Sequence, residues 1–272
     1  VKKNTIYVFT LSLIFVGFAI YGITKTKAES NVFESFPGSS EIARSTAHIE
    51  QNLMGLLPME IVINAENAGG VFQPEVLAKM EDLQDYLNKI PEVTKSMSVV
   101  DYVRNLNKLL NKDTPDNQMI TRGKAIDYVK LASLHGDNIV KSLYTEDNNE
   151  GRVTVRMKNV GSSRYQEIVE NIEGFIKANL PLSIGCTITG IVPLLMDMQG
   201  YLIESQIKTF TLAFILIFIS IALLLKSARV GIMSMIPNLI PIAITLGVMG
   251  YLGINLDVAT IMIASVAIGI SV

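Results

Sequence analysis

Four apolar stretches with few charges are separated by polar sequence along the chain. The first, Thr5–Thr24, carries no charged side chain, and a helix of that length is about 30 Å long at about 1.5 Å per residue. This length matches the hydrocarbon core of a bilayer, which about 20 apolar residues cross. The pattern predicts transmembrane helices over residues 1–24, 209–225 and 230–252 and the start of a fourth over residues 257–272.

Lysine and arginine residues beside these stretches indicate how the chain is oriented. Lys2 and Lys3 precede the first stretch, and Lys226 and Arg229 lie between the second and the third. Since the cytoplasmic flanks of membrane helices carry an excess of Lys and Arg, we expect both places to face the cytoplasm. Residues 25–208 then form an extracytoplasmic domain of a multi-pass protein in the cell (cytoplasmic) membrane.

Both ends of the sequence carry a further expectation. A cleaved signal peptide is the alternative for the first stretch, but the apolar run exceeds the usual core of about 7–15 residues. The last apolar run, Val258–Val272, is shorter than the roughly 17 residues that the shortest spans need. We therefore expect the sequence to be truncated within its fourth span relative to the native protein.

The polar middle of the chain is predicted to contain two β-α-β units. In the first, a strand over Met59–Asn64 precedes a helix that begins at Pro74, and Val93–Val100 is extended. Apolar residues three and four apart define one face of that helix: Val76, Met80, Leu83, Leu87 and Ile90.

The second unit follows the same order. Residues Arg152–Lys158 alternate between polar and apolar as in a half-buried strand, and the turn before them predicts a hairpin with Ile139–Thr145. The capping-box spacing of Ser163 and Gln166 predicts the start of the next helix. Residues Ile184–Thr189 alternate as a last strand.

Two such units in succession follow the ferredoxin-like plan. Residues 101–138 interrupt this plan as a helical insertion. A further helix, over about Ser40–Leu53, is predicted before the first strand, and its Ile42, Ile49 and Leu53 could pack on the sheet. The predicted fold class is therefore a membrane protein with an α-helical transmembrane bundle and an extracytoplasmic α+β domain.

Composition argues against several kinds of chemistry. A single cysteine, Cys186, cannot form an intrachain disulfide, and its strand pattern indicates a small core residue. With two histidines and no ligand-type spacing, we predict no metal site. The sequence carries no catalytic or cofactor-binding motif, so we expect neither enzyme activity nor a cofactor. The net charge of −2 and the absence of a basic stripe argue against nucleic acid as a partner.

Small residues recur late in the chain, where they would let membrane helices approach closely. The candidates for helix packing are Gly247, Gly250, Gly253, Ser265 and Gly269. A substrate path along the same groove is the alternative. Asp257 begins the fourth stretch, where helix capping explains an acidic residue adequately.

Two further sets of residues are candidates for a functional role. Pro237 and Pro241 flank Asn238, which indicates either a helix kink with a polar group facing the bundle or the first turns of a helix. Glu204 and Lys208 have the helical spacing of an exposed ion pair.

Three stretches together resemble a known family. Met235–Val272 reads MIPNLIPIAITLGVMGYLGINLDVATIMIASVAIGISV, Lys226–Arg229 reads KSAR, and Phe33–Leu53 reads FESFPGSSEIARSTAHIEQNL. They are similar to the paired third and fourth spans, the short basic turn before them, and the start of the porter domain in exporters of the resistance–nodulation–division superfamily. The branch is the one with the mycobacterial-membrane-protein-large (MMPL) and hopanoid-transporter-like proteins.

The resemblance implies one repeat of a proton-coupled secondary transporter that exports lipids or other hydrophobic molecules. Its implied partners are membrane lipid, a hydrophobic substrate and the remainder of the native transporter. Whether the chain also forms a homo-oligomer is left open. The linker with Glu204 and Lys208 would transmit helix motion to a porter-type domain. In this family an acidic pair that carries protons follows the Gly-Ile-x-Val of the fourth span, and here Gly269–Val272 end the sequence.

Two other functions stay open. One is a lipid- or sterol-sensing protein of the same fold that transports no substrate. The sequence does not distinguish this sensing function from transport. A mechanotransmission permease that works with an ATPase also carries a large outer domain after its first span. However, the short turn Lys226–Arg229 leaves no room there for an ATPase-docking helix.

Overall fold

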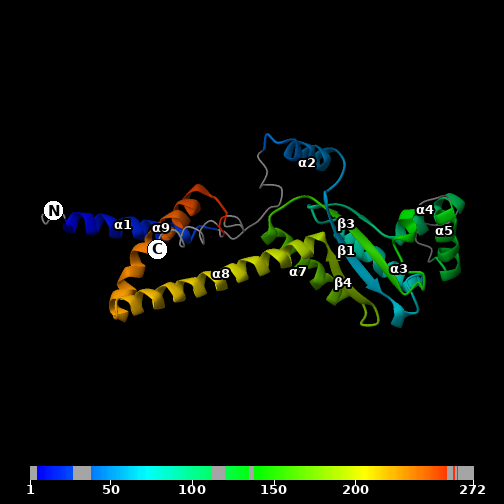
Figure 1. The fold of residues 1–272 in the computed structure, drawn as a ribbon. Coiled ribbons are helices and arrows are strands. Elements are labelled where there is room, and N and C mark those ends of the chain that lie inside the picture. Colours follow the sequence, from blue (N-terminus) through cyan, green and yellow to red (C-terminus); the bar gives the residue numbers. More distant parts are fainter. Residues whose placement is uncertain are drawn as a thin grey trace. The chain divides into compact units, whose positions relative to one another are not determined.

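The computed structural model describes residues 5–26, 38–111, 120–134 and 138–255, together with Thr260 and Met262 (Figure 1). The chain divides into two compact units. One unit comprises Val1–Ser30 and Asp197–Val272, and the other comprises Asn31–Met196.

The described part of the first unit is mainly helical. Its helices are α1 (Thr5–Ile23), most of α8 (Ile191–Leu224) and α9 (Ala228–Leu252). Within the described residues, α8 and α9 are long and apolar enough to cross a membrane, and Ile14–Ile23 of α1 is a shorter apolar helix. Because α8 begins at Ile191, the helix starts well before the span predicted over residues 209–225. The limits predicted for the spans and for the outer domain stay predictions.

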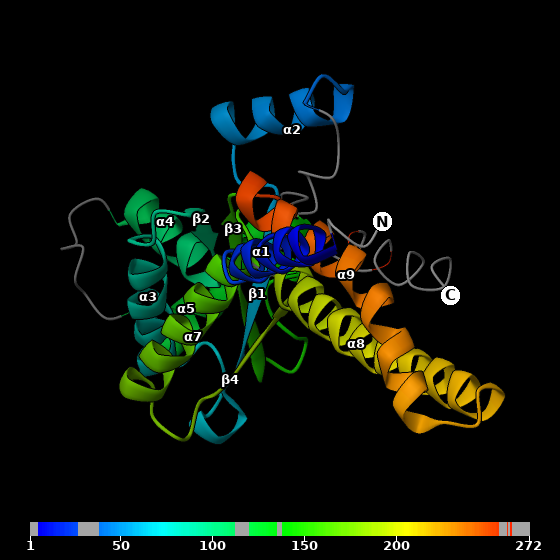
Figure 2. The same ribbon diagram turned by 90° about the vertical axis from the view of Figure 1, so that its left-hand side faces the viewer.

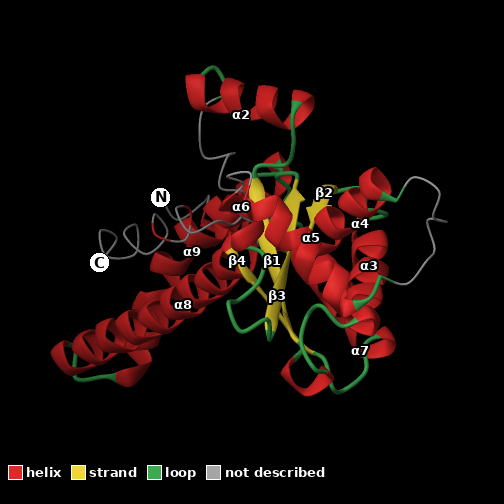
Figure 3. Cartoon of the chain, turned by 90° about the vertical axis from the view of Figure 1, so that its right-hand side faces the viewer, coloured by secondary structure: helices red, strands yellow, loops and turns green. Residues whose placement is uncertain are grey.

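The second unit contains a sheet with helices beside it (Figure 3). Its strands are β1 (Leu57–Asn64), β2 (Val93–Met97), β3 (Glu150–Met157) and β4 (Gly185–Gly190). Its helices are α2 (Glu41–Asn52), the short 3-10 helix η1 (Glu66–Ala68), α3 (Pro74–Leu87), α4 (Val99–Leu110), α5 (Arg122–Leu134), α6 (Asn138–Lys141) and α7 (Ser162–Asn179). The described part of the insertion predicted over residues 101–138 is mainly helical, with most of α4 and all of α5 in it.

The strand order shows how the two β-α-β units combine. The sheet runs β2-β3-β1-β4, and each strand is antiparallel to its neighbours. β3 therefore lies between β1 and β2, and β1 lies between β3 and β4. The strands of the two β-α-β units thus alternate within one sheet. This order confirms the ferredoxin-like plan that the sequence predicts.

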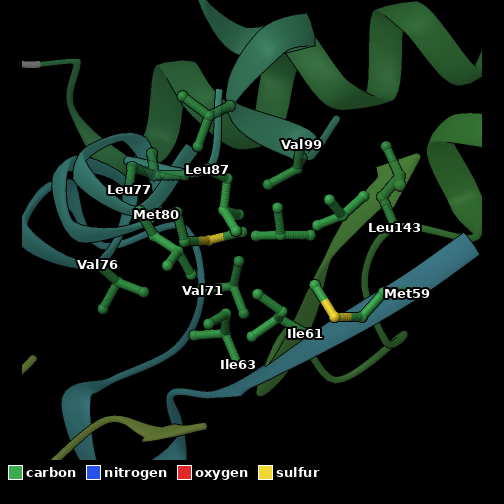
Figure 4. Packing of buried hydrophobic residues seen from close by; sticks show 14 of the residues in the cluster. Met59, Ile61, Ile63, Val71, Val76, Leu77, Met80, Leu87, Val99 and Leu143 are labelled. Atoms are coloured by element: carbon green, nitrogen blue, oxygen red, sulfur yellow. The ribbon is translucent and has the colours of Figure 1, made fainter. Parts of the chain in front are cut away.

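One face of the sheet forms the core of this unit. Met59, Ile61 and Ile63 of β1 are at most 1% exposed, and the residues between them are half-buried, as the period of two in a strand requires. Helix α3 turns Met80 and Leu87 toward the same core, and Figure 4 shows these side chains converging. Each such apolar side chain stabilises the fold by about 1.5–3 kcal/mol relative to an exposed position.

A buried polar network joins α3 to the start of α4. The Ser98 hydroxyl accepts a hydrogen bond from the Val100 amide at 3.0 Å and donates to Gln84 Oε1 at 2.7 Å. Gln84 Nε2 donates to Asp101 Oδ2 at 2.9 Å, and the same oxygen accepts from the Ser98 amide at 2.7 Å. Because every member has a partner, the network fixes where α4 begins without an uncompensated polar group.

The hairpin predicted from Ile139–Thr145 forms only at the end of that run. Tyr144 bridges Gly151, the Thr145 amide donates to the Glu150 carbonyl oxygen at 2.9 Å, and the Arg152 amide donates to that of Leu143 at 2.9 Å, but the start of the run is the short helix α6. The reason is that Val140 and Leu143, three residues apart, are both fully buried. A helical turn places both on one side, whereas a strand would turn them to opposite faces. For the same reason β2 is shorter than predicted, because Val99 and Val100 enter the core from α4.

Two local predictions near α2 and α7 are also wrong. Ile42 and Leu53 are 50% and 73% exposed, so α2 does not bury them on the sheet; instead Glu50 accepts a hydrogen bond from the Asn159 amide at 2.6 Å. Ser163 does not cap α7, because the helix already begins at Ser162 after an extended Gly161. Gln166 donates to Glu170 at 3.0 Å rather than closing a capping box.

Candidate functional site

Among the described residues of the first unit, α1 packs against α9, and the two helices cross in Figures 1 and 2. A Cβ atom added to Gly247 would lie 2.5 Å from the carbonyl oxygen of Ala19 and 2.7 Å from its Cα. A Cβ on Gly250 would collide with the carbonyl oxygen of Gly22, and one on Gly22 would collide with that of Gly247. Backbone therefore meets backbone here, which only residues without a side chain permit.

An aromatic cluster surrounds this contact. The Tyr251 ring stacks on Phe18 with centroids 4.2 Å apart and planes 12° apart, and its hydroxyl donates to the Phe18 carbonyl oxygen at 3.0 Å. The Lys25 ammonium lies 5.0 Å from the Tyr21 ring centroid and 5.1 Å from that of Tyr251, within the range of cation–π attraction. The Thr26 hydroxyl donates to the Leu246 carbonyl oxygen at 3.2 Å.

Sequence reasoning missed this cluster. Tyr21 and Tyr251 each stand at the end of an apolar stretch, which is where membrane proteins concentrate tyrosine. That enrichment was the available signal. It marks the end of a span, but it does not reveal that the two tyrosines meet over one lysine.

The predicted packing residues have different places. Gly247 and Gly250 lie in the contact with α1. Gly253 ends α9 with a left-handed φ of 68°, and a Cβ there would meet nothing within 4 Å. Ser265 and Gly269, like Asp257, fall outside the described residues. The structure therefore brings two of the five positions together.

The prolines lie in the interior of α9. Pro237 and Pro241 are nine and thirteen residues after Ala228, where the helix begins, so they do not occupy its first turns. Each lacks an amide hydrogen and so leaves one carbonyl of the preceding turn without its helical partner. Asn238 belongs to the same helix. A functional kink at these residues stays a prediction.

Glu204 and Lys208 form an ion pair on α8. Lys208 Nζ lies 2.7 Å from Glu204 Oε1, and the two side chains are 74% and 65% exposed. A pair this exposed is screened by water, and such helical pairs contribute about 0.3–0.5 kcal/mol. Its role in coupling the outer domain to the membrane stays a prediction.

A stronger ion pair holds the start of α7 to the segment before β2. Arg164 Nε lies 2.7 Å from Glu92 Oε1, and its Nη1 lies 2.7 Å from Glu167 Oε2. The hydrogen bond from Arg164 lowers the pKa of the Glu92 carboxyl, and both carboxylates raise the pKa of the Arg164 guanidinium. Glu92 and Arg164 are therefore both charged at neutral pH, and the ion pair joins α7 to the segment before β2.

Cys186 is expected to react slowly with alkylating reagents. Burial raises the pKa of its thiol to about 11 from an ordinary value of 9.0, so at pH 8 the reactive thiolate is about 100-fold scarcer. Iodoacetamide labelling of the full chain, followed by mass spectrometry, should be slower by about that factor than labelling of Thr187→Cys in a Cys186→Ser chain. Thr187 is the exposed neighbour on β4. Equal rates at the two positions would contradict the burial of the thiol.

Among the described residues, no group of three or more His, Cys, Asp or Glu side chains could hold a metal ion. The features that the described residues show are therefore close helix packing and ion pairs of charged side chains. Neither identifies a reaction.

Comparison with known proteins decides the family. The MMPL family model matches residues 35–272, which is most of the chain. The chain belongs to the MMPL family. Membership makes it a membrane protein, in agreement with the apolar helices α8 and α9.

One curated relative of this MMPL chain is "Putative membrane protein MJ1562" of Methanocaldococcus jannaschii. The two are 23% identical over 268 residues, which cover 96% of this chain and 66% of the relative. The chain thus spans just under two thirds of the length of that protein.

Proposed function

We propose that this MMPL chain is part of a proton-coupled secondary transporter that exports lipids or other hydrophobic molecules across the cytoplasmic membrane. In this proposal the sheet-bearing unit is an extracytoplasmic porter-type domain, and α1, α8 and α9 belong to a transmembrane bundle. The observation that carries the proposal is the family match over residues 35–272, on a chain with apolar helices at both ends of a ferredoxin-like domain.

The turn between α8 and α9 supports this orientation. Leu225, Lys226 and Ser227 alone separate the two helices, and Arg229 follows in the first turn of α9. A short turn with two positive charges is typical of a cytoplasmic connection. Its shortness also favours a transporter over a permease that docks an ATPase, because a docking helix would need more residues here.

Proton coupling is assigned to another part of the native transporter. No Asp or Glu occurs between Thr209 and Leu252, so α9 and the apolar part of α8 offer no carboxylate for a proton relay. Ionisable groups inside membrane helices are costly and are usually kept for function. The partners proposed are accordingly membrane lipid, a hydrophobic substrate and the rest of the transporter.

Cysteine accessibility tests the topology on which the proposal rests. With Cys186→Ser as background, Glu146→Cys should react with a membrane-impermeant maleimide on intact cells, because Glu146 is in the outer domain. Ser227→Cys should react only after the membrane is permeabilised. The opposite pattern would place the domain in the cytoplasm and remove the transporter assignment.

Transport itself needs the whole native protein in proteoliposomes. We expect a fluorescent lipid to leave the donor leaflet when a pH gradient is imposed and to stop when an ionophore collapses the gradient. Lipid binding without any gradient-dependent movement would instead favour the sensing function.

A further inference from the structure

A pocket of about 540 Å³ opens beside helix α5 of the second unit. It lies among α5, the end of α6 and the turn before β3, and its volume falls within the range of about 300–1,000 Å³ typical of small-molecule sites. No part of the proposed transport function uses it. All the lining residues named below are among those that the structure describes.

The inner wall of the pocket is apolar and fixed. Phe72 and Val129 are each 1% exposed, so neither side chain can move away without opening the core. The Phe72 ring meets the Tyr144 ring edge to face, with centroids 5.2 Å apart and planes 74° apart. Aromatic edges and faces of this kind bind an apolar chain or ring by burial of area.

The rim carries three charged groups. Lys130 of α5 and Lys141 at the end of α6 provide two ammonium groups, and Glu146 provides one carboxylate. Neither lysine forms an ion pair with any carboxylate among the residues of the chain that are described. The rim therefore has a net positive charge and two ammonium groups free to bind an anion.

Hydrogen bonds define the conformation of the turn beside the pocket. The Asp147 carboxylate accepts hydrogen bonds from the Thr145 hydroxyl at 2.5 Å and from the Asn149 amide at 3.1 Å, and these bonds lower the pKa of Asp147. Asn148 has a left-handed φ of 61°, and its carbonyl oxygen accepts from the Val71 amide at 2.8 Å. A preformed wall reduces the entropy lost on binding.

The geometry points to a binding site for an amphiphilic organic anion in this pocket. The apolar part of the ligand packs on Phe72, Tyr144 and Val129. Its carboxylate or phosphate group is bound by the ammonium groups of Lys130 and Lys141. This inference does not depend on transport, because it concerns binding to the outer domain alone.

Photo-cross-linking on the full chain in phosphatidylcholine nanodiscs tests the site. The probes are dodecanoic acid with a diazirine on its chain, the matching dodecyl phosphate and the matching neutral alcohol. The acid, the phosphate or both should label peptides within residues 126–148, as mapped by mass spectrometry. Whichever anion labels more strongly identifies the head group, and the alcohol should label these peptides at least tenfold less.

Paired lysine variants provide the control. Lys130→Gln with Lys141→Gln should reduce labelling by the anionic probes at least tenfold. Lys124→Gln with Lys177→Gln removes the same charge from exposed positions outside the pocket and should leave labelling unchanged. Equal labelling by the alcohol, labelling that survives loss of Lys130 and Lys141, or no labelling of residues 126–148 would each overturn the inference.

Discussion

Replacing Gly250 with leucine is expected to separate α1 from α9. The added Cβ would collide with the carbonyl oxygen of Gly22 and would lie 2.7 Å from the Thr26 hydroxyl. Because the first obstacle is backbone, the helix has to move; no side chain can rotate out of the way. Overpacking a close contact costs about 1–3 kcal/mol, and about 1.4 kcal/mol changes an equilibrium tenfold. We therefore expect the equilibrium constant between the population with α1 on α9 and the separated population to fall about tenfold.

Cross-linking between Thr26→Cys and Leu246→Cys in a Cys186→Ser chain measures this population. The Thr26 hydroxyl lies 3.2 Å from the Leu246 carbonyl oxygen, so a short bifunctional thiol reagent should join the two cysteines. Gly17→Leu is the matched control, because Gly17 is also in α1 and a Cβ there would meet nothing within 4 Å. Undiminished cross-linking in Gly250→Leu, or an equal loss in Gly17→Leu, would show that close backbone approach does not hold this pair.

The sequence indicates that α9 packs closely but does not identify its partner. Glycines spaced along an apolar helix predict a close neighbour, whichever helix that neighbour is. The contact of Gly247 with Ala19 joins residues far apart in the chain, and nothing in the local pattern specifies that pairing. Tyr251 and Lys25 illustrate the same limit, since each looks like an ordinary residue at the end of a span.

The ferredoxin-like sheet could be predicted because its signals are local and agree with one another. β1 alternates strictly, α3 begins at a proline and has one apolar face, and the pair recurs as β3 and α7. Sheet order then follows because two right-handed β-α-β crossovers interleave in few ways. Local periodicity and topology together were enough for this unit.

The segment around α6 shows where local reasoning stops. Ile139–Thr145 is rich in β-forming residues, but its outcome depends on the fully buried Val140 and Leu143. Because both side chains are buried on the same side, a helical turn is favoured over a strand. Which side chains are buried depends on the rest of the core, which the local sequence does not reveal. The pocket beside α6 was unpredictable for the same reason, because its apolar wall and its lysines come from separate parts of the chain.

Truncating Leu83 to alanine is expected to cost the sheet-bearing second unit about 2–5 kcal/mol of unfolding free energy. Leu83 is on the buried face of α3, 0% exposed, within the same cluster as Met59 and Ile61 of β1. Removal of its branched end leaves a cavity because the surrounding side chains are themselves fully buried and cannot collapse into the space. Since whole domains are stable by only about 5–15 kcal/mol, this single change is a large fraction of the total.

Urea unfolding of the full chain in detergent, followed by tyrosine fluorescence, measures the effect. The chain has no tryptophan, so tyrosines dominate the signal, and Tyr86, Tyr128 and Tyr165 lie in or against the core of this domain. Leu182→Ala removes the same atoms from a side chain that is 105% exposed, so its unfolding midpoint should be unchanged. A midpoint for Leu83→Ala as high as that of Leu182→Ala would mean that α3 is not packed on the sheet. That result would contradict the ferredoxin-like core described above and the positions of the residues that pack in it.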